Sequence, residues 1–150
     1  MGKLAKWLRM MGYDSVFFNG DDDAQMVKQA LAEGRIILTR DTGMIQRRAV
    51  SSGRVKTVLI TSEEPERQMM QLTGIIDLKG QSRPFTLCLE CNQPLESRSR
   101  EEVAGRVPPY VYRTQTQYVE CPICHRIYWR GTHWAAMVRK IEKLANAINN

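Results

Sequence analysis

The chain contains four cysteines, arranged as two pairs whose members are separated by two residues. The pairs are Cys88 with Cys91 and Cys121 with Cys124. A gap of two residues lets both sulfurs of a pair face one ion, and four thiolates complete the tetrahedral shell of a structural zinc site. The pattern therefore predicts a zinc ribbon, in which one Zn²⁺ joins two turns that lie far apart in the sequence.

Two other uses of paired cysteines fit the sequence less well. His125 follows Cys124, so the second pair also matches the C-x-x-C-H pattern of haem attachment. Haem attachment requires export, but charges at Lys3, Lys6 and Arg9 interrupt the apolar run that a signal peptide needs. A redox dithiol needs only one pair. We therefore expect all four cysteines to bind zinc.

The composition is that of a globular protein, with 43% hydrophobic and 25% charged residues. No apolar stretch reaches the ~18–20 residues that a membrane helix needs. We therefore expect a soluble, cytoplasmic protein with no membrane partner. The net charge of +6 favours a polyanionic partner such as nucleic acid, although solubility alone explains it equally well.

Residues 1–84 contain no cysteine and alternate between helical and strand patterns. The strand-like runs are short and apolar, as expected for strands that are buried on both faces, so the pattern predicts a parallel α/β sheet flanked by helices. The pattern opens on a helix and has only three strands, so we expect one strand to be missing or supplied elsewhere. The helices are expected over residues 3–11, 23–33, 43–51 and 65–73, and the strands over residues 15–18, 35–39 and 56–61.

Residues 85–150 hold both cysteine pairs and form the second part of the chain. Alternating residues predict a strand over residues 111–119 that leads into the second pair, and a further strand over residues 126–130. An apolar face predicts a terminal helix over residues 133–148. We therefore expect two domains, an α/β domain over residues 1–84 and a zinc ribbon with a C-terminal helix over residues 85–150.

Acidic residues follow each expected strand of the first domain, where parallel α/β sheets place their sites. Asp21, Asp22 and Asp23 follow the first strand, Asp41 the second, and Glu63 the third. Convergent carboxylates bind Mg²⁺ or Mn²⁺, which prefer oxygen ligands. Each acid also has a structural explanation, because Asp23 and Asp41 suit helix caps and Glu63 suits the positive end of a helix.

Basic and aromatic residues offer contacts to nucleic acid. Arg40, Arg47 and Arg48 surround the same edge of the sheet, and phosphate groups are bound by such cations. In the ribbon, Trp129 and Arg130 can stack on unpaired bases. Equally, Trp129 and Trp134 could pack the ribbon against the α/β part.

The stretches from Gly2 to Asp14 and from Ile37 to Asp41 resemble the PIN-fold ribonuclease family with a C-terminal zinc ribbon, known from the Mut-seven exonuclease. The resemblance implies metal-dependent RNA cleavage, with Asp23 and Asp41 as the catalytic acids. Asp22 and Glu63 are further candidate ligands for the catalytic metal, from position alone. The second half contributes residues 88–95, 106–110 and 128–134 to the resemblance.

The family pattern begins with a strand that ends in Asp, before the point that corresponds to Gly2. We therefore expect an N-terminally truncated, PIN-like sheet that lacks the first family Asp. An open sheet edge invites pairing, so strand exchange in a homodimer is one way in which the sheet could be completed. Two functions stay open: a Mg²⁺- or Mn²⁺-dependent ribonuclease, and a non-catalytic zinc-ribbon protein that binds RNA or serves as a partner subunit.

Overall fold

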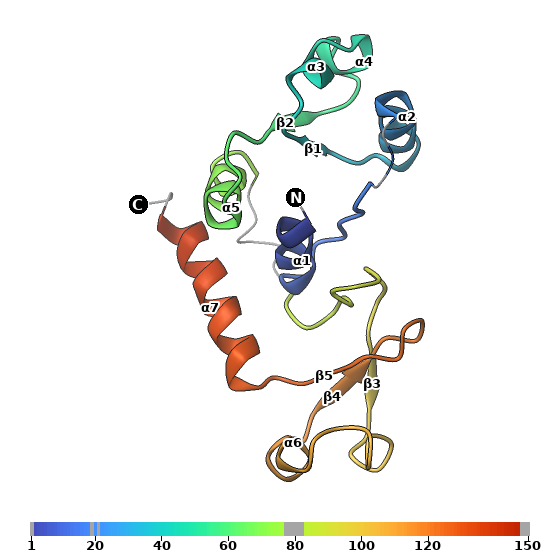
Figure 1. Cartoon of the computed structure of the whole chain (residues 1–150), viewed down its shortest axis with the longest axis vertical. Helices are drawn as coiled ribbons and strands as arrows, with labels where there is room; N and C mark the ends of the chain where they lie inside the picture. Colours follow the sequence, from blue (N-terminus) through green and yellow to red (C-terminus); the bar gives the residue numbers. More distant parts are fainter. Residues whose placement is uncertain (1, 19, 21, 77–82, 148–150) are drawn as a thin grey trace.

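A computed structural model describes residues 2–18, 20, 22–76 and 83–147 of the chain (Figure 1). In the described residues, the first half contains five helices and two strands, and the second half contains three short strands and two helices. The elements are α1 (Gly2–Met10), α2 (Asp23–Glu33), β1 (Ile37–Thr39), α3 (Thr42–Ile45), α4 (Arg48–Ser51), β2 (Thr57–Leu59), α5 (Pro65–Thr73), β3 (Glu96–Arg98), α6 (Pro109–Thr114), β4 (Tyr118–Glu120), β5 (Ile127–Tyr128) and α7 (Thr132–Ala147).

The main core lies where α1, α5 and α7 meet. Helix α1 is amphipathic and buries Leu4, Trp7 and Leu8, because apolar residues three and four apart fall on one helix face. Helix α7 packs along α5 (Figure 1) and contributes Ile141, which is fully buried. Trp134, at the start of α7, belongs to the same cluster. The core therefore contains residues from both sides of residue 85, and the predicted division into two domains stays a prediction.

The parallel sheet consists of β1 and β2, which pair with Ile37 opposite Thr57 and Thr39 opposite Leu59. Helix α2 packs against this sheet through a second cluster that includes Val27 and Ile37. Strand β2 contributes Val58 to the main core. The prediction of a mixed α/β chain with a small parallel sheet is confirmed, with the strands expected over residues 35–39 and 56–61 shortened at their ends.

The strand predicted over residues 15–18 is wrong. This segment belongs to no strand, and Val16 and Phe17 are 45% and 44% exposed. The polar backbone groups of Ser15 bond to side chains instead: its N–H donates to Asn92 Oδ1 at 3.0 Å and its carbonyl accepts from Arg9 Nε at 2.9 Å. With both of its backbone groups bonded in this way, Ser15 has no need of a sheet partner.

The helix predicted over residues 43–51 is two short helices, α3 and α4. Arg47 separates them, because its backbone is extended, with φ −66° and ψ 140°. The other predicted helices of the first half, over residues 3–11, 23–33 and 65–73, are confirmed as α1, α2 and α5 to within one residue at each end.

The second half forms an antiparallel sheet in the order β3-β4-β5. The strand predicted over residues 111–119 is wrong in its first part, which is helix α6. Pro109 opens this helix at the position where a proline costs no hydrogen bond. The Tyr118 hydroxyl then ties the strand that follows to α6, donating to the carbonyl oxygens of Val111 and Gln115 at 3.1 and 2.9 Å.

The strand predicted over residues 126–130 is confirmed only as the short β5, and the terminal helix is confirmed as α7. The predicted end of that helix, Ile148, lies outside the described residues. In the part of the chain that the structure describes, no helix is both long enough and apolar enough to cross a membrane.

Candidate zinc site and acidic sheet edge

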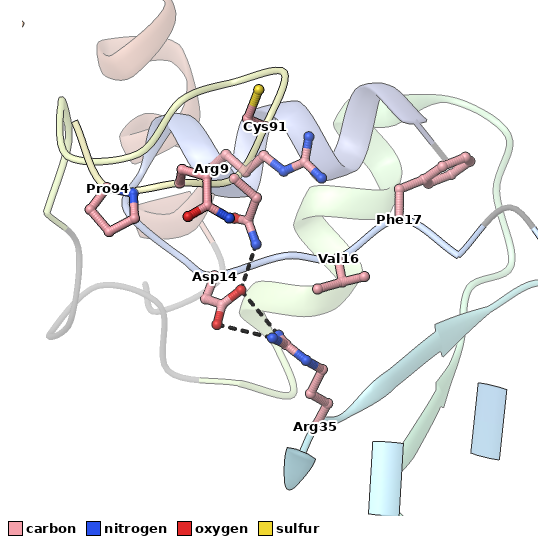
Figure 2. A pocket seen from close by; sticks show the side chains of 9 residues that line it. Arg9, Asp14, Val16, Phe17, Arg35, Cys91 and Pro94 are labelled. Carbon is pink, nitrogen blue, oxygen red and sulfur yellow. Dashed lines mark hydrogen bonds and ion pairs between the residues drawn. The ribbon is translucent and has the colours of Figure 1, made fainter. Parts of the chain in front are cut away.

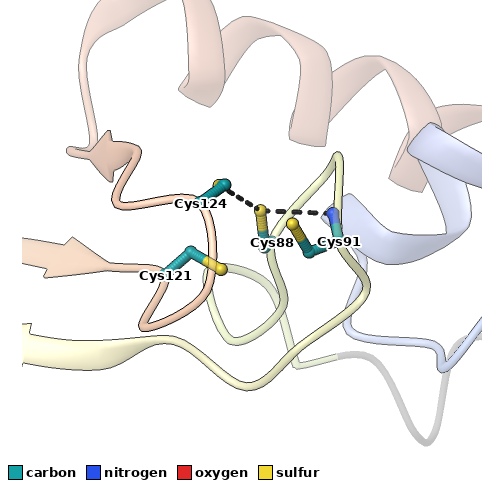
Figure 3. Close-up of side chains that lie close together, drawn as sticks. All are labelled: Cys88, Cys91, Cys121 and Cys124. Atoms are coloured by element: carbon teal, nitrogen blue, oxygen red, sulfur yellow. Dashed lines mark hydrogen bonds between the residues drawn. The ribbon is translucent and has the colours of Figure 1, made fainter.

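The four cysteines lie together at one end of the antiparallel sheet (Figure 3). Their sulfur atoms all fall within 4.8 Å of one another, and Cys88 Sγ is 3.6 Å from Cys124 Sγ. A tetrahedral zinc ion with bonds of about 2.3 Å places its sulfurs about 3.8 Å apart, so this arrangement fits zinc. The predicted set of four zinc ligands is confirmed as a cluster that could bind the ion.

Each cysteine pair forms the same kind of turn, which we call a knuckle. The residue after each pair, Asn92 or His125, has a left-handed backbone with φ of 58° or 63°. Its N–H donates to the carbonyl oxygen of the first cysteine, Cys88 or Cys121, at 2.9 Å in both knuckles. Asn and His accept the left-handed region more readily than most residues. The sequence therefore favours two turns that present their sulfurs to a common centre.

Hydrogen bonds to the sulfurs favour the thiolate form at part of the site. Burial opposes ionisation of Cys124, but the backbone and side chain of Arg126 lower the pKa of this thiol to about 6. Burial and the neighbouring cysteines raise the pKa of Cys91. The Tyr128 hydroxyl lies 3.3 Å from Cys88 Sγ and can donate to it. A bound Zn²⁺ deprotonates coordinating thiols outright, so Arg126 and Tyr128 are placed to stabilise the charge that remains on the ligands.

A buried carboxylate beside the zinc site was missed by sequence reasoning. The Glu120 side chain is only 6% exposed and accepts from Arg106 at 2.9 Å and from His125 Nδ1 at 3.1 Å. Arg98 Nε lies 3.4 Å away. The hydrogen bond from Arg106 lowers the pKa of Glu120 to about 2, against the effect of burial. The sequence feature that could have identified it is a charged residue, Glu120, at an inward-facing strand position next to Cys121.

Three of the four candidate acids of the first half have a bonding partner in the structure. Asp22 caps α2 and accepts from the N–H of Ala24 at 2.9 Å. Asp23 lies partly buried in the first turn of α2. Asp41 caps α3 and accepts from the N–H of Gly43 at 2.9 Å. The exposed side chain of Glu63 bonds to Arg40 at 3.1 Å.

The structure brings two of these acids to one edge of the sheet. Parallel pairing of β1 and β2 places their carboxyl ends together, and Asp41 lies two residues beyond the end of β1. The ion pair between Arg40 and Glu63 holds the Glu63 carboxylate beside that end. Within residues 2–18, 20, 22–76 and 83–147, only the four cysteines form a group of three or more metal-ligating side chains. Asp21 lies outside the described residues.

The predicted nucleic-acid contacts are dispersed. Arg47 and Arg48 are exposed at the start of α4. Trp129 is partly buried, and the guanidinium of Arg130 stacks over the Phe85 ring at 5.2 Å. Phe85 also meets Trp134 edge to face, with ring centroids 5.0 Å apart. Trp134 thus packs the ribbon side of the chain into the main core, which agrees with the packing role that the sequence suggests for this residue.

Together these features define a mixed α/β protein with a small parallel sheet and a cluster of four cysteines that could bind zinc. The family model described as Mut7-C RNAse domain matches residues 1–141. The chain belongs to this family, which confirms the resemblance and indicates a ribonuclease-related function. No curated protein and no solved structure gives a significant match to the chain.

Proposed function

We propose that the chain is a metal-dependent ribonuclease that hydrolyses RNA phosphodiester bonds at the acidic edge of the parallel sheet. The observation that carries the proposal is the match to a ribonuclease domain family over nearly the whole chain. The exposed carboxylates of Asp41 and Glu63 near the carboxyl ends of β1 and β2 support the choice of this edge.

The donors at this edge suit Mg²⁺ or Mn²⁺ in chemical kind. One oxygen of Asp41 accepts from Gly43, and a carboxylate has acceptor sites to spare. Mg²⁺ is commonly held by one or two carboxylates, with water and substrate phosphate completing its shell. We assign Asp41 and Asp23 as the main ligands, with Asp22 and Glu63 as further candidates.

A Mg²⁺ or Mn²⁺ ion bound at this edge would supply an activated water and stabilise the charge that develops on the phosphate. Asp41 and Asp23 would hold this ion at the edge of the sheet. Arg47 and Arg48, which are exposed on the neighbouring α4, bind the phosphates of the RNA strand. Release of Arg40 from Glu63 on RNA binding would add a third cation.

The test compares cleavage of end-labelled single-stranded RNA by the zinc-loaded chain with and without added Mg²⁺ or Mn²⁺. Asp41→Asn is the decisive variant, because Asn caps a helix as well as Asp does but lacks the charge that binds the metal. Cleavage by Asp41→Asn is expected to fall at least about 100-fold. Glu142→Gln, an exposed change on α7, serves as the control. Full activity in Asp41→Asn would show that the assigned site is wrong.

A second candidate function is RNA binding without catalysis, as a binding protein or partner subunit. It is favoured by the acids of the described residues, which form no group of three close enough to share an ion. It predicts salt-sensitive RNA binding that Trp129→Ala or Arg130→Ala weakens, with no cleavage under any metal condition. Metal-dependent cleavage that Asp41→Asn abolishes would exclude it.

The remaining parts of the proposal concern architecture and assembly. We propose that the parallel sheet is PIN-like, that residues 1–84 form the nuclease part, and that residues 85–150 form the ribbon part. RNA is the proposed partner. The open edges of the β1–β2 sheet would also let two copies pair, and light scattering on the purified chain tests this by giving the mass of a dimer or of a monomer.

A further inference from the structure

The first knuckle, residues 88–92, is attached to the first helix and the segment after it. Four contacts join residues that are far apart in the sequence. Lys6 Nζ pairs with Glu90 Oε1 at 2.9 Å, and an Arg9 guanidinium nitrogen donates to the Leu89 carbonyl at 2.8 Å. Asn92 provides the other two contacts, both through its side-chain amide. Every residue of this knuckle apart from the cysteines therefore contacts the first part of the chain.

The side chain of Asn92 is the centre of this attachment. Its Oδ1 accepts from the backbone N–H of Ser15 at 3.0 Å, and its Nδ2 donates to Asp14 Oδ1 at 2.6 Å. Asp14 in turn bonds to Arg35, at 3.1 Å through Oδ1 and 3.2 Å through Oδ2. Hydrogen bonds from Arg35 and then Asn92 lower the pKa of Asp14, although burial opposes them. Asp14 is therefore a charged link between the knuckle and the start of the parallel sheet.

Arg9 holds the same segment from the other side. This arginine is only 8% exposed, an unusual burial for a charged residue. Its Nε donates to the carbonyl of Ser15 at 2.9 Å, while its other bond reaches the knuckle at Leu89. The N–H of Ser15 is thus bonded by Asn92 of the knuckle, and its carbonyl by Arg9, which also contacts the knuckle.

These contacts also form one wall of a pocket of about 440 Å³ (Figure 2). On one side lie Cys91, Asn92 and Pro94 of the zinc-binding half. On the other lie Asp14 and the exposed Phe17. Figure 2 shows Asp14 held between Arg35 and the knuckle side of the pocket. The pocket is therefore formed only when the knuckle is in place.

We propose that zinc binding by the four cysteines also orders the segment of residues 13–18 and the wall of this pocket, with Asn92 and Arg9 as the positioning residues. The knuckle carries two of the four sulfurs, so an ion bound by all four fixes this turn against the second knuckle. Loss of zinc releases this turn, and Asn92 then no longer presents its amide to Ser15 and Asp14. The zinc site thus acts on the first part of the chain as well as on the ribbon.

The test uses NMR to measure the rate of hydrogen exchange at the backbone amide of Ser15 in the ¹⁵N-labelled, zinc-loaded chain. Asn92→Gly is the decisive variant, because glycine adopts the left-handed φ of 58° freely, so the knuckle keeps its shape while the amide is lost. His125→Gly is the matched control, since His125 holds the equivalent left-handed position in the second knuckle. Zinc affinity of each variant is measured by competition with a coloured chelator.

In zinc-loaded Asn92→Gly we expect the Ser15 amide to exchange at least about five-fold faster, as for the loss of one ordinary hydrogen bond. Zinc affinity should stay within about two-fold of that of the unchanged chain. His125→Gly should leave exchange at Ser15 unchanged, and removal of zinc from the unchanged chain should increase it. If the Ser15 amide exchanges at the same rate in zinc-loaded Asn92→Gly and in the unchanged chain, the proposal is wrong. This comparison uses zinc-loaded chains only, so it holds even if the zinc-free chain unfolds as a whole.

Discussion

Glu120 is the buried charge whose loss should cost the ribbon most stability. Its carboxylate is 6% exposed and is shared by Arg98, Arg106 and His125. Its pKa falls from 4.5 to about 2 on folding, and one pKa unit corresponds to about 1.4 kcal/mol, so the charged form contributes up to about 3 kcal/mol. Because the pKa is lowered in the folded chain, this stability is present above about pH 4.5 and is lost as the pH falls toward about 2.

Glu120→Gln keeps the size of the side chain and removes its charge. Arg106 is 42% exposed and can turn to water, so we expect a loss of about 2 kcal/mol rather than the full 3. The measurement is urea unfolding of the zinc-loaded chain at pH 7, where zinc ligation is intact. Glu101→Gln, at an exposed site of the same region, should change the free energy of unfolding by less than about 0.5 kcal/mol. If both variants unfold alike, the buried ion pairs do not stabilise the ribbon.

Three further changes test the zinc site, a helix cap and the core. Tyr128→Phe removes the hydroxyl near Cys88 Sγ and should weaken zinc binding about ten-fold in chelator competition, whereas unchanged affinity would show that this hydrogen bond does not support the ligand. Gly34→Ala places a side chain at φ 66°, with open space around it, and should cost about 1 kcal/mol of unfolding free energy from backbone strain alone. Leu4→Ala opens a cavity at a 1% exposed position and should cost about 3 kcal/mol, and a loss below 1 kcal/mol would mean that the core collapses around it.

The parts of the fold that sequence predicts well are those that local chemistry decides. Helix α2 begins after a capping Asp22 and ends at Gly34, whose backbone is left-handed. Helix α5 opens with Pro65, whose missing N–H costs nothing at that position. The four-cysteine cluster also depends on local structure, because each pair of cysteines needs only its own turn to present two sulfurs.

The segment of residues 15–18 shows where local chemistry stops deciding the structure. Its apolar residues favour a strand, but the backbone groups of Ser15 are bonded by Arg9 and Asn92. Asn92 is distant in the sequence, so no window around residues 15–18 contains the group that competes with a strand partner. Residues 111–114 fail for a related reason, since alternation favours a strand while Pro109 starts a helix that Tyr118 then secures.

The order of the strands predicts an acidic edge, and in the structure two of the predicted acids cap helices. Asp22 and Asp41 each cap a helix that begins where a strand or an extended segment ends. At this edge of the sheet, a helix cap and a metal ligand would both use a side-chain oxygen that lies where an extended segment ends. The two roles are compatible, because a cap uses one carboxylate oxygen and leaves the other for a cation. Capping therefore does not argue against catalysis, and only a change that keeps the cap and removes the charge separates the two roles. At position 41, that change is Asp41→Asn.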